Sequence, residues 1–187
     1  RYNIIGGLNP NEQEDIYNSV ALKISQQKQF DVRDFQPVYV SDAQFETDFS
    51  LKQFKNTSRN HRLVKYILSK TEKYKYHNEI DLDSELYTIE HILPESADEN
   101  WGDFNQDEIN RSVYRIGNLT LLEKALNRDA DIRSFPEKKT FYQQSNCNVT
   151  KNITIYYDTW NEDRITSRQA NLAKDAKSIW KIQELNQ

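Results

Sequence analysis

The sequence predicts an α+β domain that is mostly α-helical and contains one small two-stranded β-element. Apolar residues recur at helical spacing over much of the chain, and two short β-branched segments stand between the helical ones. Breaks are few, since the 187 residues include four Gly and four Pro. With 36% hydrophobic and 12% aromatic residues, the chain can pack a core as one domain or two small ones.

The front of the chain is expected to form three helices, over residues 11–29, 42–55 and 60–74. In each segment apolar side chains recur at the spacing of one buried helix face. These side chains are Ile16, Val20, Ile24, Phe45, Phe49, Phe54, Leu63, Ile67 and Leu68. We attribute this pattern to packing and not to chemistry.

Two strands and a helix are predicted in the middle of the chain. Residues 86–94 are rich in β-branched and aromatic residues and end at a proline. Residues 118–122 form the second strand, with Gly117 before it as a turn residue, and good helix formers follow over 123–131. Strand, strand, helix is therefore the expected order.

Two further helices are expected, over residues 137–145 and 164–184. Asn161 is the expected N-cap of the second, and Asp163 favours the start of this helix electrostatically. The apolar stripe of this part of the chain comprises Leu172, Ala176, Ile179 and Leu185.

The middle segment also carries residues suited to phosphodiester hydrolysis. This reaction needs a base that takes a proton from water and a hard cation that neutralises charge on the phosphate. His91 is the candidate base, since its imidazole has an ordinary pKa near working pH. Glu90 and Asn127 offer the oxygen ligands that Mg²⁺ prefers, but adjacent strand residues share a face only where the strand bends or ends.

The order of these motifs resembles the ββα-metal finger of HNH endonucleases. The motifs are Thr-Ile-Glu-His-Ile-Leu-Pro over residues 88–94, Ile-Gly-Asn-Leu-Thr-Leu-Leu over 116–122, and Asn127. The resemblance implies that His91 is the general base and that Asn118 orients it. It also implies that Glu90 and Asn127 bind Mg²⁺, with Mn²⁺ as an alternative.

A wider pattern resembles the C-terminal nuclease domain of GmrSD-type modification-dependent restriction enzymes. It covers roughly residues 60 to 185 and adds Trp101, Phe135, Lys138, Tyr142, Trp160, Arg168, Leu172, Ala173, Ala176 and Trp180. The resemblance implies a DNA endonuclease that acts against foreign, possibly modified, DNA in bacterial defence. It further implies a nucleotide-hydrolysing domain before the nuclease.

Other carboxylates compete with Glu90 as metal ligands. Asp131 is the strongest rival, because it lies one helical turn beyond Asn127. Glu95, Asp98 and Asp129 are further candidates.

The charge balance argues against tight DNA binding by the whole chain, which carries a net charge of −4. Its distribution is uneven: residues 79–108 hold eleven acidic and no basic residues, whereas 111–139 hold seven basic and four acidic ones. Arg128, Lys138 and Arg168 are taken as candidate phosphate contacts. We expect the rest of the protein or a homo-oligomer to assist binding.

Position 1 is Arg and no Met occurs, so we expect the chain to be part of a longer polypeptide. Residues 1–58 are expected to be a helical connector or the tail of a preceding domain. Residues 59–187 are expected to form the nuclease domain, with its finger at about 86–131. No segment has the length of a membrane span, the single Cys147 can form no internal disulfide, and a cytoplasmic location is expected.

Two classes of function remain open. The first is a Mg²⁺-dependent DNA endonuclease, which the set of His91, Asn118 and Asn127 favours. The second is a catalytically silent DNA-binding or interaction module that retains the finger, which the acidic balance favours. An RNase is a third, less favoured option.

Overall fold

The computed structural model describes residues 1–82 and 84–186. Helices make up 59% of the structure, and the described residues form nine α-helices and one two-stranded antiparallel sheet. The predicted mostly helical α+β class is therefore confirmed.

The elements follow one another in an order that embeds the sheet among helices. The α-helices are α1 (Pro10–Ser25), α2 (Asp42–Leu51), α3 (Ser58–Tyr76), α4 (Gln106–Ser112), α5 (Lys124–Ala130), α6 (Phe135–Tyr142), α7 (Asn148–Lys151), α8 (Ile153–Tyr156) and α9 (Glu162–Ile179). The strands are β1 (Tyr87–His91) and β2 (Leu119–Glu123). Short 3₁₀ helices are η1 (Val32–Val38), η2 (Glu99–Trp101), η3 (Ile116–Asn118) and η4 (Gln183–Leu185).

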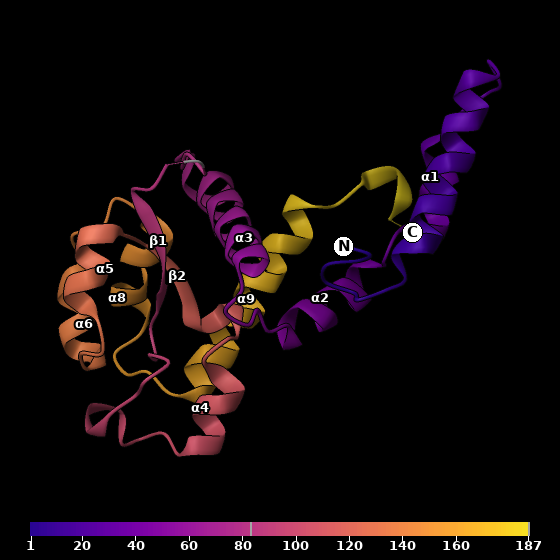
Figure 1. The fold of residues 1–187 in the computed structure, drawn as a ribbon. Helices are drawn as coiled ribbons and strands as arrows, with labels where there is room; N and C mark the ends of the chain where they lie inside the picture. The colour runs from indigo at the N-terminus through magenta and orange to yellow at the C-terminus, as the bar shows by residue number, and fades with distance from the viewer. Residues whose placement is uncertain (83, 187) are drawn as a thin grey trace.

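The two strands lie between α3 and α9 on one side and α5, α6 and α8 on the other (Figure 1). Their antiparallel register runs from Tyr87 opposite Glu123 to His91 opposite Leu119. α5 starts at the residue after β2, so strand, strand and helix follow in the predicted order.

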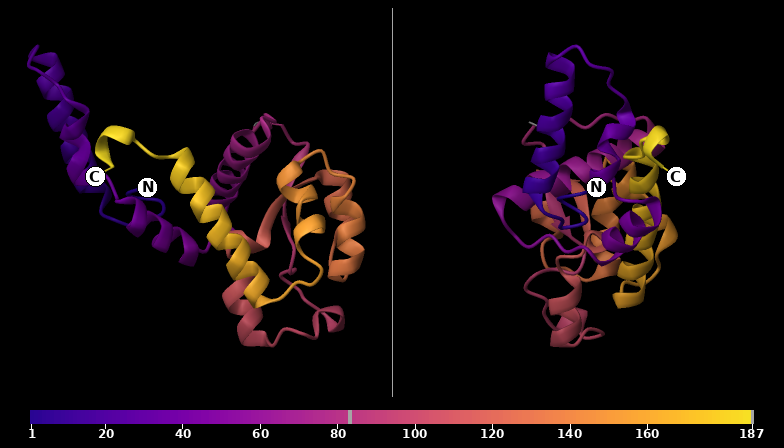
Figure 2. Two further views of the ribbon diagram at one scale, coloured as in Figure 1. Left: turned by 180° about the vertical axis from the view of Figure 1, so that it is seen from behind. Right: turned by 90° about the vertical axis from the view of Figure 1, so that its right-hand side faces the viewer.

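Helix α9 connects two hydrophobic clusters and crosses much of the molecule (Figure 2). One cluster packs Phe45 and Phe49 of α2 against Leu172 of α9. The other contains Trp160 and Ile165 together with side chains of β2 and α6. The division of the chain into residues 1–58 and 59–187 stays a prediction, although α2 packs closely on α9.

The long helices agree with the apolar periodicity, because their buried faces stabilise them. Asn161 caps α9 as predicted and accepts a hydrogen bond from the Arg164 backbone N–H. At the far end of α1, Ile24 is 57% exposed, so its expected burial was wrong. This helix projects away from the body (Figure 1), and of its residues Val20 alone is buried.

In the part of the chain that the structure describes, none of the helices has the length and apolar character needed to cross a membrane.

Gly117 permits a close contact between η3 and α9. A Cβ atom built on this residue would lie 2.2 Å from the carbonyl oxygen of Ile165 and 2.9 Å from the Cβ of Gln169. The Gln169 amide oxygen also accepts a hydrogen bond from the Gly117 N–H. The glycine is therefore required by the approach of a helix backbone, and not only by a turn.

We expect Gly117→Ala to lower the free energy of unfolding by about 2 kcal/mol or more, because the added methyl group overlaps a backbone oxygen. Urea unfolding monitored by circular dichroism measures the loss. Gly102→Ala is the matched control, since its Cβ would meet its nearest neighbour at 3.4 Å. Equal losses in the two variants would contradict the close-contact explanation.

Candidate active site

Four of the residues predicted for the site line one open cleft of about 440 Å³. They are Glu90, His91, Asn127 and Asp131. Its other lining residues are Ile89, Pro94, Glu95, Ser96, Arg128 and Ile132. The end of β1, the loop after it and the C-terminal half of α5 thus form the walls.

Glu90 and His91 both line the cleft because β1 ends at His91. Adjacent side chains of a regular strand point to opposite faces, but the chain bends at Ile92 and Leu93. Both residues of this bend are fully buried and anchor it to the core. Because β1 ends at His91, Glu90 and His91 can line the same cleft although they are adjacent in the sequence.

Asn118 fixes the backbone that follows His91. Its Oδ1 accepts hydrogen bonds from the Leu93 N–H at 2.8 Å and from the Trp160 indole N–H at 3.0 Å. Its Nδ2 donates to the carbonyl oxygens of Leu93 and Val113. All four hydrogen-bonding positions of the amide are occupied, and none of these bonds reaches the imidazole. Asn118 therefore acts on His91 through the loop and not by direct contact.

Glu90 lies in a buried polar cluster. Its Oε1 accepts hydrogen bonds from the Lys138 ammonium and the Tyr142 hydroxyl, both at 2.7 Å. Lys138 also donates to the His91 carbonyl oxygen at 2.8 Å. Burial raises the pKa of Glu90 and lowers that of Lys138, and the attraction between the two charges opposes both shifts. Lys138 thus holds the backbone of His91, while Asn118 holds that of Leu93.

The imidazole of His91 is neutral at physiological pH. Burial lowers its pKa to about 4, although the Glu95 carboxylate, 3.4 Å from Nε2, favours the charged form. Lys138 and His61 contribute smaller effects in the same direction as burial. A neutral imidazole can accept a proton, as a general base must.

Asn127 connects α5 to β1 and leaves its amide oxygen available. Its Nδ2 donates to Thr88 Oγ1 at 2.9 Å and to the Ile89 carbonyl oxygen at 3.0 Å. Among the described residues no hydrogen bond reaches its Oδ1. Asp131 follows at the C-cap of α5 with a positive φ of 40°, which places it at the edge of the same cleft.

The oxygen donors in the cleft are of the kind that Mg²⁺ takes. They are Oε2 of Glu90, the amide oxygen of Asn127 and the carboxylate of Asp131, and Mg²⁺ commonly uses one or two protein carboxylates with water and phosphate completing its shell. No cluster of three or more His, Cys, Asp or Glu side chains that could hold a metal occurs within residues 1–82 and 84–186. The cleft therefore fits a site completed by substrate and water, and not a closed protein cage.

Two of the three candidate phosphate contacts are not placed to touch a duplex at the surface. Lys138 is 0% exposed and binds Glu90, while Arg168 is 5% exposed and donates to backbone carbonyl groups of η3 and β2. A buried side chain with these partners cannot reach the backbone of a duplex on the surface. Arg128 differs, since its side chain is 78% exposed and lines the cleft.

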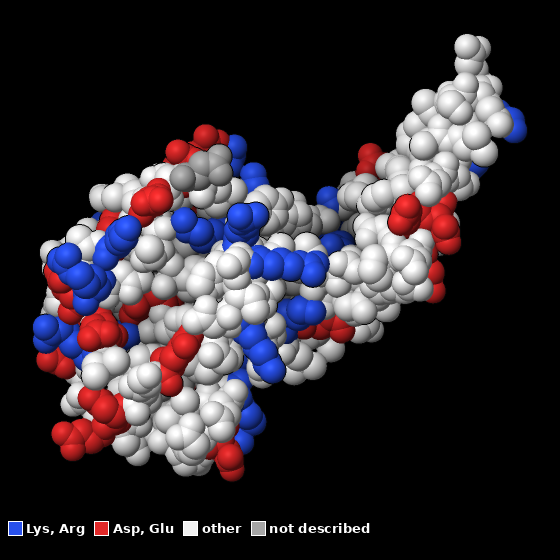
Figure 3. Space-filling model, in the orientation of Figure 1, with Lys and Arg blue, Asp and Glu red and all other residues white. Residues whose placement is uncertain are grey.

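Basic side chains on α3 were missed as candidates. Figure 3 shows blue side chains across the middle of one face, over α3 and the adjacent part of α9, and red ones at the lower edge near η2 and α4. The basic residues of α3 are Arg59, Arg62, Lys65, Lys70, Lys73 and Lys75, and its one acidic residue, Glu72, is buried. Counting charge per helix would have found them.

A sequence profile of the family described as "GmrSD restriction endonucleases, C-terminal domain" matches residues 39–175. The chain belongs to this family. A search of curated proteins found no match. The matched range contains the whole cleft, with β1, β2 and α5, and most of α9.

Within this GmrSD C-terminal domain, the sequence alone did not reveal the partners of Glu90. Lys138 and Tyr142 lie 48 and 52 residues further along the chain and face inward from α6. The two are four residues apart, which puts them on one helix face. Glu95 was named only as a competing ligand, whereas it contacts His91.

We expect Lys138→Met to lower the free energy of unfolding by about 3 kcal/mol, because it leaves the Glu90 carboxylate buried without its cation. The double variant Glu90→Gln/Lys138→Met removes both charges and should be clearly more stable than Lys138→Met alone. Urea denaturation of the two single variants and the double variant measures the coupling. Additive losses would show that the ion pair contributes no coupling energy.

We expect His91 to make stability fall with acidification. The unfolded imidazole titrates near pH 6.5 and the folded one near 4, so the unfolded state binds the extra proton between these values. Between pH 7 and pH 5, wild type should lose about 2 kcal/mol more unfolding free energy than His91→Gln. Urea unfolding in EDTA buffer at both pH values tests this, and parallel losses would refute the lowered pKa.

Proposed function

We propose that this domain is a metal-dependent DNA endonuclease of the HNH type that acts in the restriction of foreign, modified DNA. The observation that carries the proposal is the cleft that joins His91 to the oxygens of Glu90, Asn127 and Asp131, in a chain of a restriction endonuclease family. A base beside hard-cation ligands is the arrangement that metal-assisted hydrolysis of a phosphodiester needs.

His91 is the proposed general base. Its imidazole is neutral at pH 7 and lines the cleft, so it can take a proton from a water molecule beside a bound phosphate. Glu95 lies 3.4 Å from Nε2 and would stabilise the imidazolium that forms. Asn118 and Lys138 are positioning residues, because they bind the loop and the carbonyl group on either side of the base.

Glu90 and Asn127 are the proposed metal ligands, and Asp131 is the third candidate. A bound Mg²⁺ or Mn²⁺ ion would neutralise charge on the phosphate and on the departing oxygen. The Oε1 atom of Glu90 is occupied by Lys138 and Tyr142, so Oε2 is the atom available to a metal. The two hydrogen bonds that Asn127 donates to β1 fix the orientation of its side-chain amide.

DNA would approach the cleft past Arg128 and the N-terminal part of α3. Asn56, just before this helix, donates a hydrogen bond to Glu95 at 2.9 Å, which places the start of α3 beside the cleft. Arg59 and Arg62 are exposed there. Such contacts with phosphates position a duplex without reading its sequence.

A catalytically silent DNA-binding module is the second candidate function. The ion pair between Glu90 and Lys138 favours it, because an ammonium group 2.7 Å from a carboxylate weakens that carboxylate as a metal ligand. This alternative keeps the DNA surface and gives the cleft a structural role.

Cleavage of supercoiled plasmid by wild type and His91→Ala, each with Mg²⁺, Mn²⁺ or EDTA, tests the proposal. We expect nicking that requires metal and falls by roughly 10²- to 10⁴-fold in the variant, since a general base contributes about that factor. Modified phage DNA and RNA are offered in parallel to identify the substrate class.

The control variant is His77→Asn, which replaces an exposed histidine in a left-handed conformation by a residue that tolerates it. It should cut as wild type does. If folded wild type cuts none of these substrates with either metal but still binds DNA, the silent module is the better description.

A further inference from the structure

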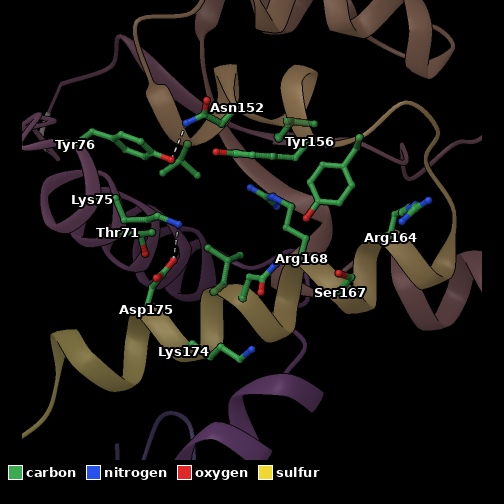
Figure 4. Close-up of a pocket in the computed structure, with 15 residues that line it drawn as sticks. Thr71, Lys75, Tyr76, Asn152, Tyr156, Arg164, Ser167, Arg168, Lys174 and Asp175 are labelled. Atoms are coloured by element: carbon green, nitrogen blue, oxygen red, sulfur yellow. Dashed lines mark hydrogen bonds and ion pairs between the residues drawn. The ribbon is translucent and has the colours of Figure 1, made fainter.

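A second pocket, separate from the cleft, lies between α3, α8 and α9. It has a volume of about 430 Å³ and is shown in Figure 4. Four basic side chains and one acidic one line it, in a chain whose total charge is −4. The basic ones are Lys75, Arg164, Arg168 and Lys174, and the acidic one, Asp175, pairs with Lys75 at 3.1 Å.

Arg168 forms the buried end of this pocket. Its guanidinium lies near the centre of the residues drawn in Figure 4, on the side of α9 that faces Tyr76 and Tyr156. The side chain is nearly inaccessible to solvent, and none of its partners among the described residues is a carboxylate. A buried cation without a counter-charge is costly, and a bound anion would offset that cost.

The hydrogen bonds of Arg168 leave one edge of the guanidinium unused. Nη1 donates to the carbonyl oxygens of Gly117 at 2.7 Å and Leu119 at 2.8 Å, with a longer contact to Ile116. Within the described residues Nε makes no hydrogen bond, and Nη2 is buried without a partner. Nε and Nη2 point to the same side of the planar group, which is the edge that binds two oxygens of one phosphate or carboxylate.

We propose that this pocket binds the phosphate group of a nucleotide, with Arg168 as the buried anchor and Arg164 and Lys174 as exposed contacts at its rim. No ion pair occupies either rim side chain among the described residues, so both are available to an anion. Three donors of this kind suit the several oxygens and the charge of a phosphate better than one carboxylate.

An exposed aromatic ring at the rim favours a nucleotide over a bare anion. Tyr156 lines the pocket and is 72% exposed, although a large apolar ring gains little from solvent. Such a ring can stack on a base while the phosphate reaches the guanidinium. The phosphate could come from a free nucleotide or from the end of a DNA strand, and the two sources share this chemistry.

Isothermal titration calorimetry of the whole chain in EDTA buffer tests the pocket without relying on cleavage. The probes are inorganic phosphate, thymidine 5′-monophosphate, and a short single strand with and without a 5′-phosphate. We expect saturable binding of the monophosphate that weakens about threefold in Arg164→Gln and in Lys174→Gln, the size of one exposed charge contact.

Two control variants locate the binding. Lys28→Gln removes an exposed cation in the loop after α1, and Arg128→Gln removes one in the cleft, so neither should change the affinity for the monophosphate. Arg168→Lys keeps the charge but loses the two-pronged edge, and should bind more weakly than either rim variant. If it does not fold, the two rim variants still decide.

Binding of the 5′-phosphorylated strand that is tighter than that of the unphosphorylated one and weakens in Arg164→Gln and Lys174→Gln, without binding of the monophosphate, would support the pocket and assign it to strand ends. Absence of saturable binding by every phosphate-bearing probe would overturn the proposal. So would an affinity that falls only in Arg128→Gln, since this would place the ligand in the cleft. Loss of plasmid cleavage alone bears on the proposed nuclease and leaves this measurement unaffected.

Discussion

The fully bonded amide of Asn118 is the interaction on which the rest of the site depends. It joins η3, just before β2, to the loop that follows β1 through one accepted and one donated hydrogen bond with Leu93, and it also donates to Val113 and accepts from Trp160. If one of these hydrogen bonds were lost, a buried polar group would be left without a partner, at a cost in folding free energy. The four hydrogen bonds therefore stabilise one another. The direction of the chain after His91 is therefore set by a residue that does not touch its imidazole.

Helix α9 packs against η3 and stabilises the segment around Asn118. Gly117 lets the helix backbone come into contact, Gln169 binds Gly117 and the end of α2, and Arg168 binds the carbonyl groups on either side of Asn118. The contacts with η3 and β2 link residues 49 to 52 positions apart in the chain, and the contact with α2 links residues 120 positions apart. A five-residue strand and a two-turn helix are too short to be stable alone, so the candidate cleft depends on this packing against the much longer α9.

The sequence predicted the long elements and the composition of the cleft, but not its electrostatics. The apolar periodicity predicted α3 and α9. The motifs predicted one site for Glu90, His91, Asn127 and Asp131, and all four line the same cleft. The short helices α4, α7 and α8 were missed, since four to seven residues are too few to show a period. The burial of Lys138 was also beyond sequence reasoning, because its partner is 48 residues away and lysine is usually exposed.

Arg168 lines the second pocket and also binds the backbone on either side of Asn118. Nη1 of Arg168 binds the carbonyl groups of Gly117 and Leu119, while Nε and Nη2 of the same planar group make no hydrogen bond among the described residues and are the atoms proposed to bind an anion. Since a guanidinium is rigid, an anion that pulled on one edge would also move the other. Any such movement reaches Asn118, which lies between the two carbonyl groups, and through it the loop after His91. Coupling between the sites would therefore pass through a contiguous set of hydrogen bonds, and its size depends on how far the turn can move before the Asn118 bonds oppose it.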